Sequence, residues 1–198
     1  MIGAVIAFAL AAGVIVLLPG PDSMLMLRAI AVGGRSGALR TAAGIITGVA
    51  VWVIAAAAGL AALLKASETG YTALRLVGAA YLLLLGVQTL RRRARPERKG
   101  VLGTGYAAGV ACDLFNPKVG VFFVTFLPGF VPDGTSVATA TLVFGAVFAL
   151  ETLIYFAAML LAVERLTRWL DDDVVRRRIE RASGAVLIAF GLRLATEG

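Results

Sequence analysis

The chain has no histidine and only one cysteine, Cys112. Without histidine it lacks the side chain that most often serves as acid, base or metal ligand near neutral pH. A single cysteine forms no internal disulfide and cannot run a dithiol relay. The phosphate-binding loop G-x-x-x-x-G-K-[ST] of nucleotide-driven pumps is also missing. We therefore expect no enzyme, no cofactor and no metal site, and soft-metal binding is disfavoured.

Charged residues are scarce, at 16%, whereas hydrophobic residues make up 60% of the 198 positions. A typical soluble domain has about 25% charged and 45–50% apolar residues. A soluble chain of this length could not bury so much apolar surface. The composition therefore excludes disorder, a coiled coil and an ordinary soluble enzyme, and it predicts an all-α integral membrane protein.

Six apolar segments are read as membrane-spanning helices, which need about 20 residues each. They cover residues 3–33, 41–64, 71–90, 101–131, 137–163 and 182–196. We expect the first to be retained and not cleaved as a signal peptide, because no basic side chain precedes Arg28.

Fifteen of the 19 lysine and arginine residues fall near the end of the first predicted span or in the segments that follow the first, third and fifth spans. Such residues concentrate on the cytoplasmic side of membrane proteins. The pattern predicts a multi-pass membrane protein with both termini outside, and with basic cytoplasmic loops that contact lipid head groups. No aromatic stacking platform accompanies these loops, so we expect no nucleic-acid partner.

The chain divides into two halves, residues 1–99 and 100–198, with three predicted helices each. Pro21 and Pro117, 96 residues apart, break the first helix of each half. Three helices cross the membrane an odd number of times, so the second half would start on the opposite side and insert upside down relative to the first. We therefore predict one transmembrane domain of two inverted three-helix repeats, with a central binding site at the broken helices. Chance similarity of two apolar stretches is the alternative.

The first break contains Pro19, Gly20, Pro21 and Asp22. Two prolines around a glycine are expected to end one half-helix and start another. Pro21 suits the first position of the new helix, and Asp22 lies in its first turn, where the helix dipole stabilises a negative charge. The N–H groups at this helix start attract anions.

The second break contains Asp113, Asn116, Pro117 and Lys118. Asn116 is expected to cap the next half-helix, and Pro117 again suits its first position. A lysine here opposes the helix dipole, and a charge deep in the bilayer costs about 2.5–3.5 kcal/mol. Lys118 therefore needs an anionic partner, which is Asp22, Asp113 or a substrate carboxylate. A buried ion pair that only fixes helix packing is the alternative.

Glu151 is the one charged residue of the fifth predicted span. It lies about 14 residues, or roughly 21 Å, from the helix start. An ionisable group at such a depth indicates function, either proton coupling or binding of a substrate ammonium group. A hydrogen bond to Tyr155 or to a neighbouring helix is the alternative.

These ionisable groups suit a zwitterionic amino acid. Its carboxylate would meet the half-helix N-termini and Lys118, and its ammonium group would meet Asp22, Asp113 or Glu151. A G-x-x-x-G pattern at Gly44 and Gly48 also allows close helix packing, and a homodimer is possible. From the residues alone, the prediction is a transporter of a small polar solute.

Two stretches resemble the lysine exporter family, LysE, in its homoserine/threonine exporter branch, RhtB. They are LLPGPDSMLMLRAIAVGGRSGALRTAAGIITGV in the first half and DLFNPKVGVFFVTFLPGFV in the second. The closing GAVLIAFGLRLA fits as well, so the resemblance covers essentially the whole chain. It implies a six-helix inner-membrane exporter of amino acids, generally driven by the proton gradient and using no nucleotide.

By motif match, the resemblance places the site at the PGPD and NPK motifs, and more loosely at Glu151. Few acidic residues can reach a central cavity, and Lys118 offsets one of them. We therefore expect a neutral substrate, such as homoserine, threonine or leucine, exported by proton antiport. The alternatives are an exporter of another small solute or cation, and a passive channel.

Overall fold

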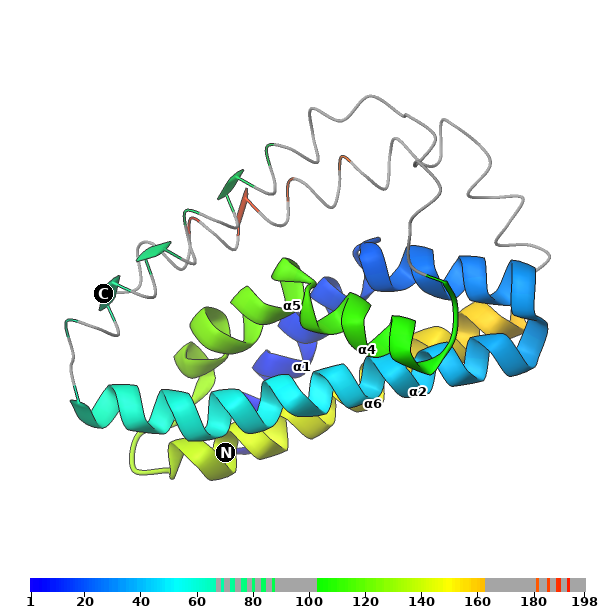
Figure 1. Cartoon of the computed structure of the whole chain (residues 1–198). Helices are drawn as coiled ribbons and strands as arrows, with labels where there is room; N and C mark the ends of the chain where they lie inside the picture. Colours follow the sequence, from blue (N-terminus) through cyan, green and yellow to red (C-terminus); the bar gives the residue numbers. More distant parts are fainter. Residues whose placement is uncertain are drawn as a thin grey trace.

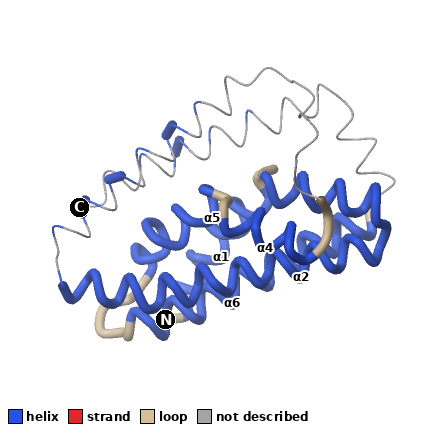
Figure 2. The backbone as a smooth tube through the Cα atoms, in the orientation of Figure 1, coloured by secondary structure: helices blue, strands red, loops and turns tan. Residues whose placement is uncertain are grey.

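The computed structural model of the chain describes residues 1–66 and 103–162, together with scattered helical positions between 69 and 87 and between 181 and 192. Every regular element in these residues is helical (Figures 1 and 2). The prediction of an all-α protein is therefore confirmed for the described part of the chain.

The first half begins with two helices, α1 (Ile2–Leu17) and α2 (Pro21–Ala66). α2 bends at Gly34, whose φ of +56° is a left-handed conformation that glycine adopts readily. The two arms of α2 fold back on each other there (Figure 1), and a Cβ on Gly37 would lie 3.2 Å from the carbonyl oxygen of Ala29. The bend lies where the sequence predicts the end of the first span.

The second half begins with α4 (Tyr106–Leu114) and α5 (Pro117–Val121). A π-helical turn, η1 (Phe122–Phe126), and a 3₁₀ turn, η2 (Leu127–Phe130), continue from α5. The helix axis bends by 51° between α4 and residues 117–130. The last continuous helix that the structure describes, α6 (Val137–Leu161), is preceded by Ser136, whose side chain caps it by accepting from the Thr139 N–H.

Two helical stretches among the described residues are long and apolar enough to cross a membrane, Pro21–Gly59 and Val137–Leu161. The bent pair Tyr106–Leu114 and Pro117–Phe130 makes a third if it is one span. α1 is apolar but shorter. The predicted spans 71–90 and 182–196 lie largely outside the described residues, so the six-span inverted repeat, with its halves at 1–99 and 100–198, stays a prediction.

The G-x-x-x-G pattern of α2 packs against α4 of the same chain. A Cβ on Gly44 would collide with the backbone carbonyl of Tyr106, and one on Gly109 of α4 would collide with the carbonyl of Thr41. The Gly105 N–H also donates to Thr41 Oγ1, at 2.9 Å. Small residues let these two helix backbones touch, so this pattern serves a contact within the chain.

The buried apolar side chains of the described residues form two clusters. The larger cluster is rich in phenylalanine and joins α1, the second arm of α2, α5, η1, η2 and α6; it includes Phe8, Phe122, Phe123, Phe126, Phe144 and Phe148. Its rings stack closely, with the centroids of Phe8 and Phe144 4.7 Å apart. The smaller cluster joins the two arms of α2 to α6 and contains Met26, Ile30, Ala38, Ala42, Ile45, Phe156 and Met159.

Candidate functional site

The first helix break lies where the two prolines predict it. α1 ends at Leu17, Leu18 has extended backbone, and α2 starts at Pro21. Proline at the first helical position loses no hydrogen bond, because that N–H has no partner within the helix. Asp22 lies in the first turn of α2, as predicted.

The second break is also confirmed, together with its cap. The Asn116 side chain accepts a hydrogen bond from the Lys118 N–H at 3.1 Å, and Pro117 begins α5. The same asparagine donates from Nδ2 to Oδ2 of Asp22, at 2.5 Å. One side chain therefore caps α5 and ties it to the start of α2, 94 positions earlier in the chain.

Lys118 binds the end of α1. Its Nζ donates to the carbonyl oxygens of Ile15, at 3.1 Å, and Leu18, at 2.9 Å. The last carbonyls of a helix have no partner within it, and a cation there is favoured by the helix dipole. Gly20 leaves room for this contact, since a Cβ on it would lie 3.1 Å from Nζ.

This arrangement corrects the expected choice of partners for Lys118. Within the described residues, no hydrogen bond joins its Nζ to Asp22 or to Asp113. The two carboxylates act on it through their charge, and the direct contacts are carbonyl oxygens that the first break sets free.

Asp113 is completely buried at the contact between α4 and α2. Neither of its carboxylate oxygens has a hydrogen-bond partner within the described residues, and the same holds for Oδ1 of Asp22. Trp52 Nε1 donates to the Asp113 backbone carbonyl at 3.3 Å. The Asp113 side chain lies against Gly48, where a Cβ would come within 2.6 Å of Oδ2. Buried carboxylate oxygens without partners are costly, so this pair is suited to receive a proton or a cation.

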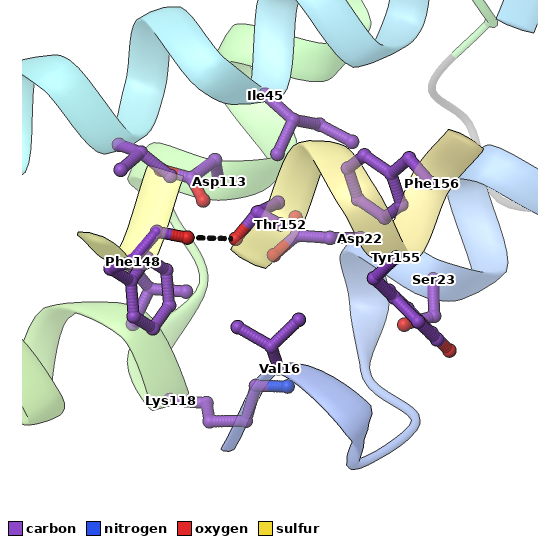
Figure 3. Close-up of a pocket in the computed structure, with 12 residues that line it drawn as sticks. Val16, Asp22, Ser23, Ile45, Asp113, Lys118, Phe148, Thr152, Tyr155 and Phe156 are labelled. Carbon is purple, nitrogen blue, oxygen red and sulfur yellow. Dashed lines mark hydrogen bonds between the residues drawn. The ribbon is translucent and has the colours of Figure 1, made fainter. Parts of the chain in front are cut away.

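A small cavity lies between the two breaks (Figure 3). Its polar lining consists of Asp22, Ser23, Asp113, Lys118, Thr152 and Tyr155. Its apolar lining consists of Val16, Ile45, Val49, Val119, Phe148 and Phe156. All six of these apolar residues belong to the two hydrophobic clusters, four to the larger and two to the smaller, so the cavity lies where the two clusters meet. It leaves about 20 Å³ for the centres of water-sized molecules, which is room for about one water.

The structure brings together most of the predicted site residues but not all. Asp22, Asp113 and Lys118 line the cavity, and Asn116 joins the two breaks. Glu151 does not line it. Its carboxylate faces α1, with both oxygens 3.9 Å from the position of a Cβ on Gly13, and its Oε2 is buried without a partner in the described part of the chain.

The remaining motif residues shape the backbone. Pro19 and Gly20 lie in the non-helical link before α2, whereas Pro21 and Pro117 each start a helix. They position the polar groups and contribute no side chain to the cavity lining.

Sequence reasoning missed the contributions of α6 and of the second arm of α2. On α6, the lining residues Phe148, Thr152 and Tyr155 are spaced four and three positions apart, as on one face of a helix. This spacing could have indicated from the sequence that the three side chains point the same way. On α2, Ile45 and Val49 lie one turn apart beside Gly48. Nothing in the sequence distinguishes these two from other aliphatic residues of the span.

Comparisons with known proteins give a family match over most of the chain and several related membrane proteins. Residues 13–198 match the model of the LysE type translocator family. An uncharacterized membrane protein of Pseudomonas aeruginosa, PA4757, is 33% identical, over 92% of this chain and 90% of its own length. The leucine efflux protein of Salmonella typhimurium is 29% identical, over 92% and 90%. The uncharacterized membrane protein YrhP of Bacillus subtilis is 22% identical, over 92% and 93%.

No solved structure gives a significant match. The family match includes both helix breaks and all the cavity-lining residues. The resemblance seen in the PGPD and NPK motifs is thereby confirmed, and the chain belongs to the LysE type translocator family.

Proposed function

We propose that this protein exports neutral amino acids across the inner membrane in exchange for protons. Its family and its relatives named leucine efflux protein support amino-acid export. The observation that carries the proposal is the pair of buried carboxylates, Asp22 and Asp113. Three of their four oxygens are without hydrogen-bond partners in the described residues, beside a cavity where two broken helices meet.

The charges at the cavity favour one added cation. Asp22 and Asp113 supply two negative charges, and Lys118 supplies one positive charge. The ammonium group of an amino acid or a proton would neutralise the remaining carboxylate. Because a protonated carboxylic acid has no charge to offer an ammonium group, proton and substrate compete for the same oxygens. Such competition at one site, approached from the two sides of the membrane in turn, produces antiport.

The substrate carboxylate has a matching partner in Lys118. An ammonium group has three N–H donors, and Lys118 uses two of them on the end of α1. The third can bind the carboxylate. The positive N-terminal end of α2, marked by Asp22 and Ser23 in the cavity lining, adds to the attraction.

The cavity must widen before an amino acid binds. Its present volume accommodates about one water molecule. Broken helices let half-helices move while neighbouring segments keep their packing, and transporters built on them open alternately to the two sides. Glu151 lies on the same helix as Thr152, and we propose it as a second coupling group outside the cavity.

Efflux from cells tests this function. Cells that lack their own exporters are loaded with single amino acids by dipeptide feeding, and efflux is followed with and without an uncoupler. We expect efflux of a neutral amino acid against its gradient, dependent on the protein and abolished by the uncoupler. Flat curves across the whole panel, with the protein detected in the membrane, would contradict the proposal. Efflux only down the gradient and insensitive to the uncoupler would indicate a passive channel.

A matched pair of variants tests the carboxylate. Asp113→Asn keeps the shape of the side chain and removes its charge, and we expect export to fall at least about tenfold. Asp133→Asn makes the same chemical change at an exposed position outside the cavity, and we expect normal export. Equal export by the two variants would remove Asp113 from the site.

A further inference from the structure

Two apolar residues of the cavity lining lie away from Lys118. In the view of Figure 3, Ile45 and Phe156 lie beyond Asp22 from the lysine, and Asp113 lies level with Ile45. Both residues are buried, at 0% and 3% exposure. They belong to the smaller hydrophobic cluster, whereas the apolar residues near Lys118 belong to the larger one.

The proposed contacts limit where the substrate side chain goes. The carboxylate and the ammonium group of an α-amino acid are attached to one carbon atom, so anchoring both leaves the side chain free only to turn about the line that joins them. With the carboxylate at Lys118 and the ammonium group at the two aspartates, the uncharged lining formed by Ile45 and Phe156 can receive that side chain once the cavity widens.

This part of the lining suits an uncharged aliphatic side chain. Among the described lining residues the charged groups are Asp22, Asp113 and Lys118, and in the proposed binding mode the carboxylate and the ammonium group of the substrate already engage all three. A charged substrate side chain would be buried there without a partner, at a high cost. An aromatic substrate side chain would compete for space with the ring of Phe156. Met26 and Met159 belong to the same hydrophobic cluster as these two residues, and their unbranched side chains adjust to the shape of a neighbour.

We infer that Ile45 and Phe156 form the side-chain subsite, and that they select amino acids with uncharged aliphatic side chains over aromatic and charged ones. This inference rests on the proposed export function and adds the residues that set its selectivity.

Competition between substrates tests the subsite. Cells loaded with leucine, phenylalanine and lysine together report the ratios of their efflux, and a ratio does not depend on the amount of protein. In Ile45→Ala or Phe156→Leu the subsite is larger by three carbon atoms, and we expect the phenylalanine-to-leucine ratio to rise at least about tenfold, since a single methylene in an apolar pocket changes discrimination by about 10–200-fold. In Ile45→Phe the subsite is smaller, and with alanine added to the load we expect leucine efflux to fall while alanine efflux remains.

The control is Ile54→Ala. Ile54 lies on the same arm of α2, is 63% exposed and does not line the cavity, so the wild-type ratios should persist. If Ile45→Ala does not reach the membrane, Ile45→Val removes one carbon atom with less disturbance, and we then expect a severalfold rise in the ratio.

The failures of the two proposals are distinguishable. A wild-type protein that exports no amino acid would overturn the export function, and the subsite with it. A wild-type protein that exports, with ratios unchanged in Ile45 and Phe156 variants as in Ile54→Ala, would overturn the subsite alone. Lysine efflux equal to leucine efflux in the wild type would also overturn it.

Discussion

Gly48 controls the position of the central carboxylate, so replacing it with alanine should impair transport. A Cβ at this position would lie 2.6 Å from Oδ2 and 2.7 Å from Cβ of Asp113. Ordinary van der Waals contact begins near 3.4 Å, so the carboxylate would have to move by about 0.8 Å. Displacement of a reacting group by 1 Å can lower a rate by about 10²-fold. We therefore expect Gly48→Ala to lower export at least about tenfold.

Gly48→Ala should change the free energy of unfolding only modestly, because two contributions oppose each other. Alanine in place of glycine favours a helix by about 1 kcal/mol. Overpacking of a well-filled interior costs about 1–3 kcal/mol; rotation of the Asp113 side chain relieves the contact with Oδ2, whereas the 2.7 Å contact with its Cβ requires α4 to shift slightly. For Gly44→Ala the obstacle is the Tyr106 backbone, which cannot turn away. We expect Gly44→Ala to lower the stability of the protein more than Gly48→Ala does.

The assay combines amino-acid efflux with thermal unfolding in detergent. Gly59→Ala is the matched control, because Gly59 lies on the same helix with no atom within 4 Å of its would-be Cβ. It should raise stability by about 0.5–1 kcal/mol and leave efflux unchanged. Efflux by Gly48→Ala equal to that of Gly59→Ala would refute the proposed close contact of α2 with the carboxylate.

Two further substitutions test the remaining charged groups. Lys118→Ala removes both hydrogen bonds to the end of α1, each worth about 1.5–3 kcal/mol when the donor is charged; export should be abolished and the melting temperature lowered, with insertion into the membrane retained. An unchanged melting temperature would contradict the capping role. Glu151→Gln keeps the packing against Gly13 and removes the charge, so export should respond less to an imposed pH gradient at the same protein level; an unchanged response would exclude Glu151 as a coupling group.

The sequence was sufficient to locate the breaks and their local chemistry. Proline restricts its own backbone and lacks an N–H, so the starts of two helices at Pro21 and Pro117 follow from residue identity alone. The cap by Asn116 is equally local, since its partner is the N–H two positions away. Such features depend on short stretches of chain, and neighbouring helices need not be known.

The partners of the ionisable groups could not be predicted in this way. For Lys118, counting charges gave two aspartates and a substrate carboxylate, and it omitted the carbonyl oxygens of Ile15 and Leu18, which lie about 100 positions earlier. For Glu151, depth in the membrane indicated a central location, but the rotation of α6 turns this residue toward α1 and turns Thr152 into the cavity. Helix rotation is determined by tertiary packing, here by the phenylalanine cluster around Phe148.

The hydrogen bond between Asn116 and Asp22 can persist whether or not the proposed site is occupied. Oδ2 of Asp22 accepts from Asn116, while Oδ1 is buried without a partner among the described residues. A substrate ammonium group or a proton can therefore take Oδ1 and the oxygens of Asp113 while the two breaks remain joined. Under the proposed exchange, the movement that opens the site would then occur in the segments around this joint and not at the joint itself.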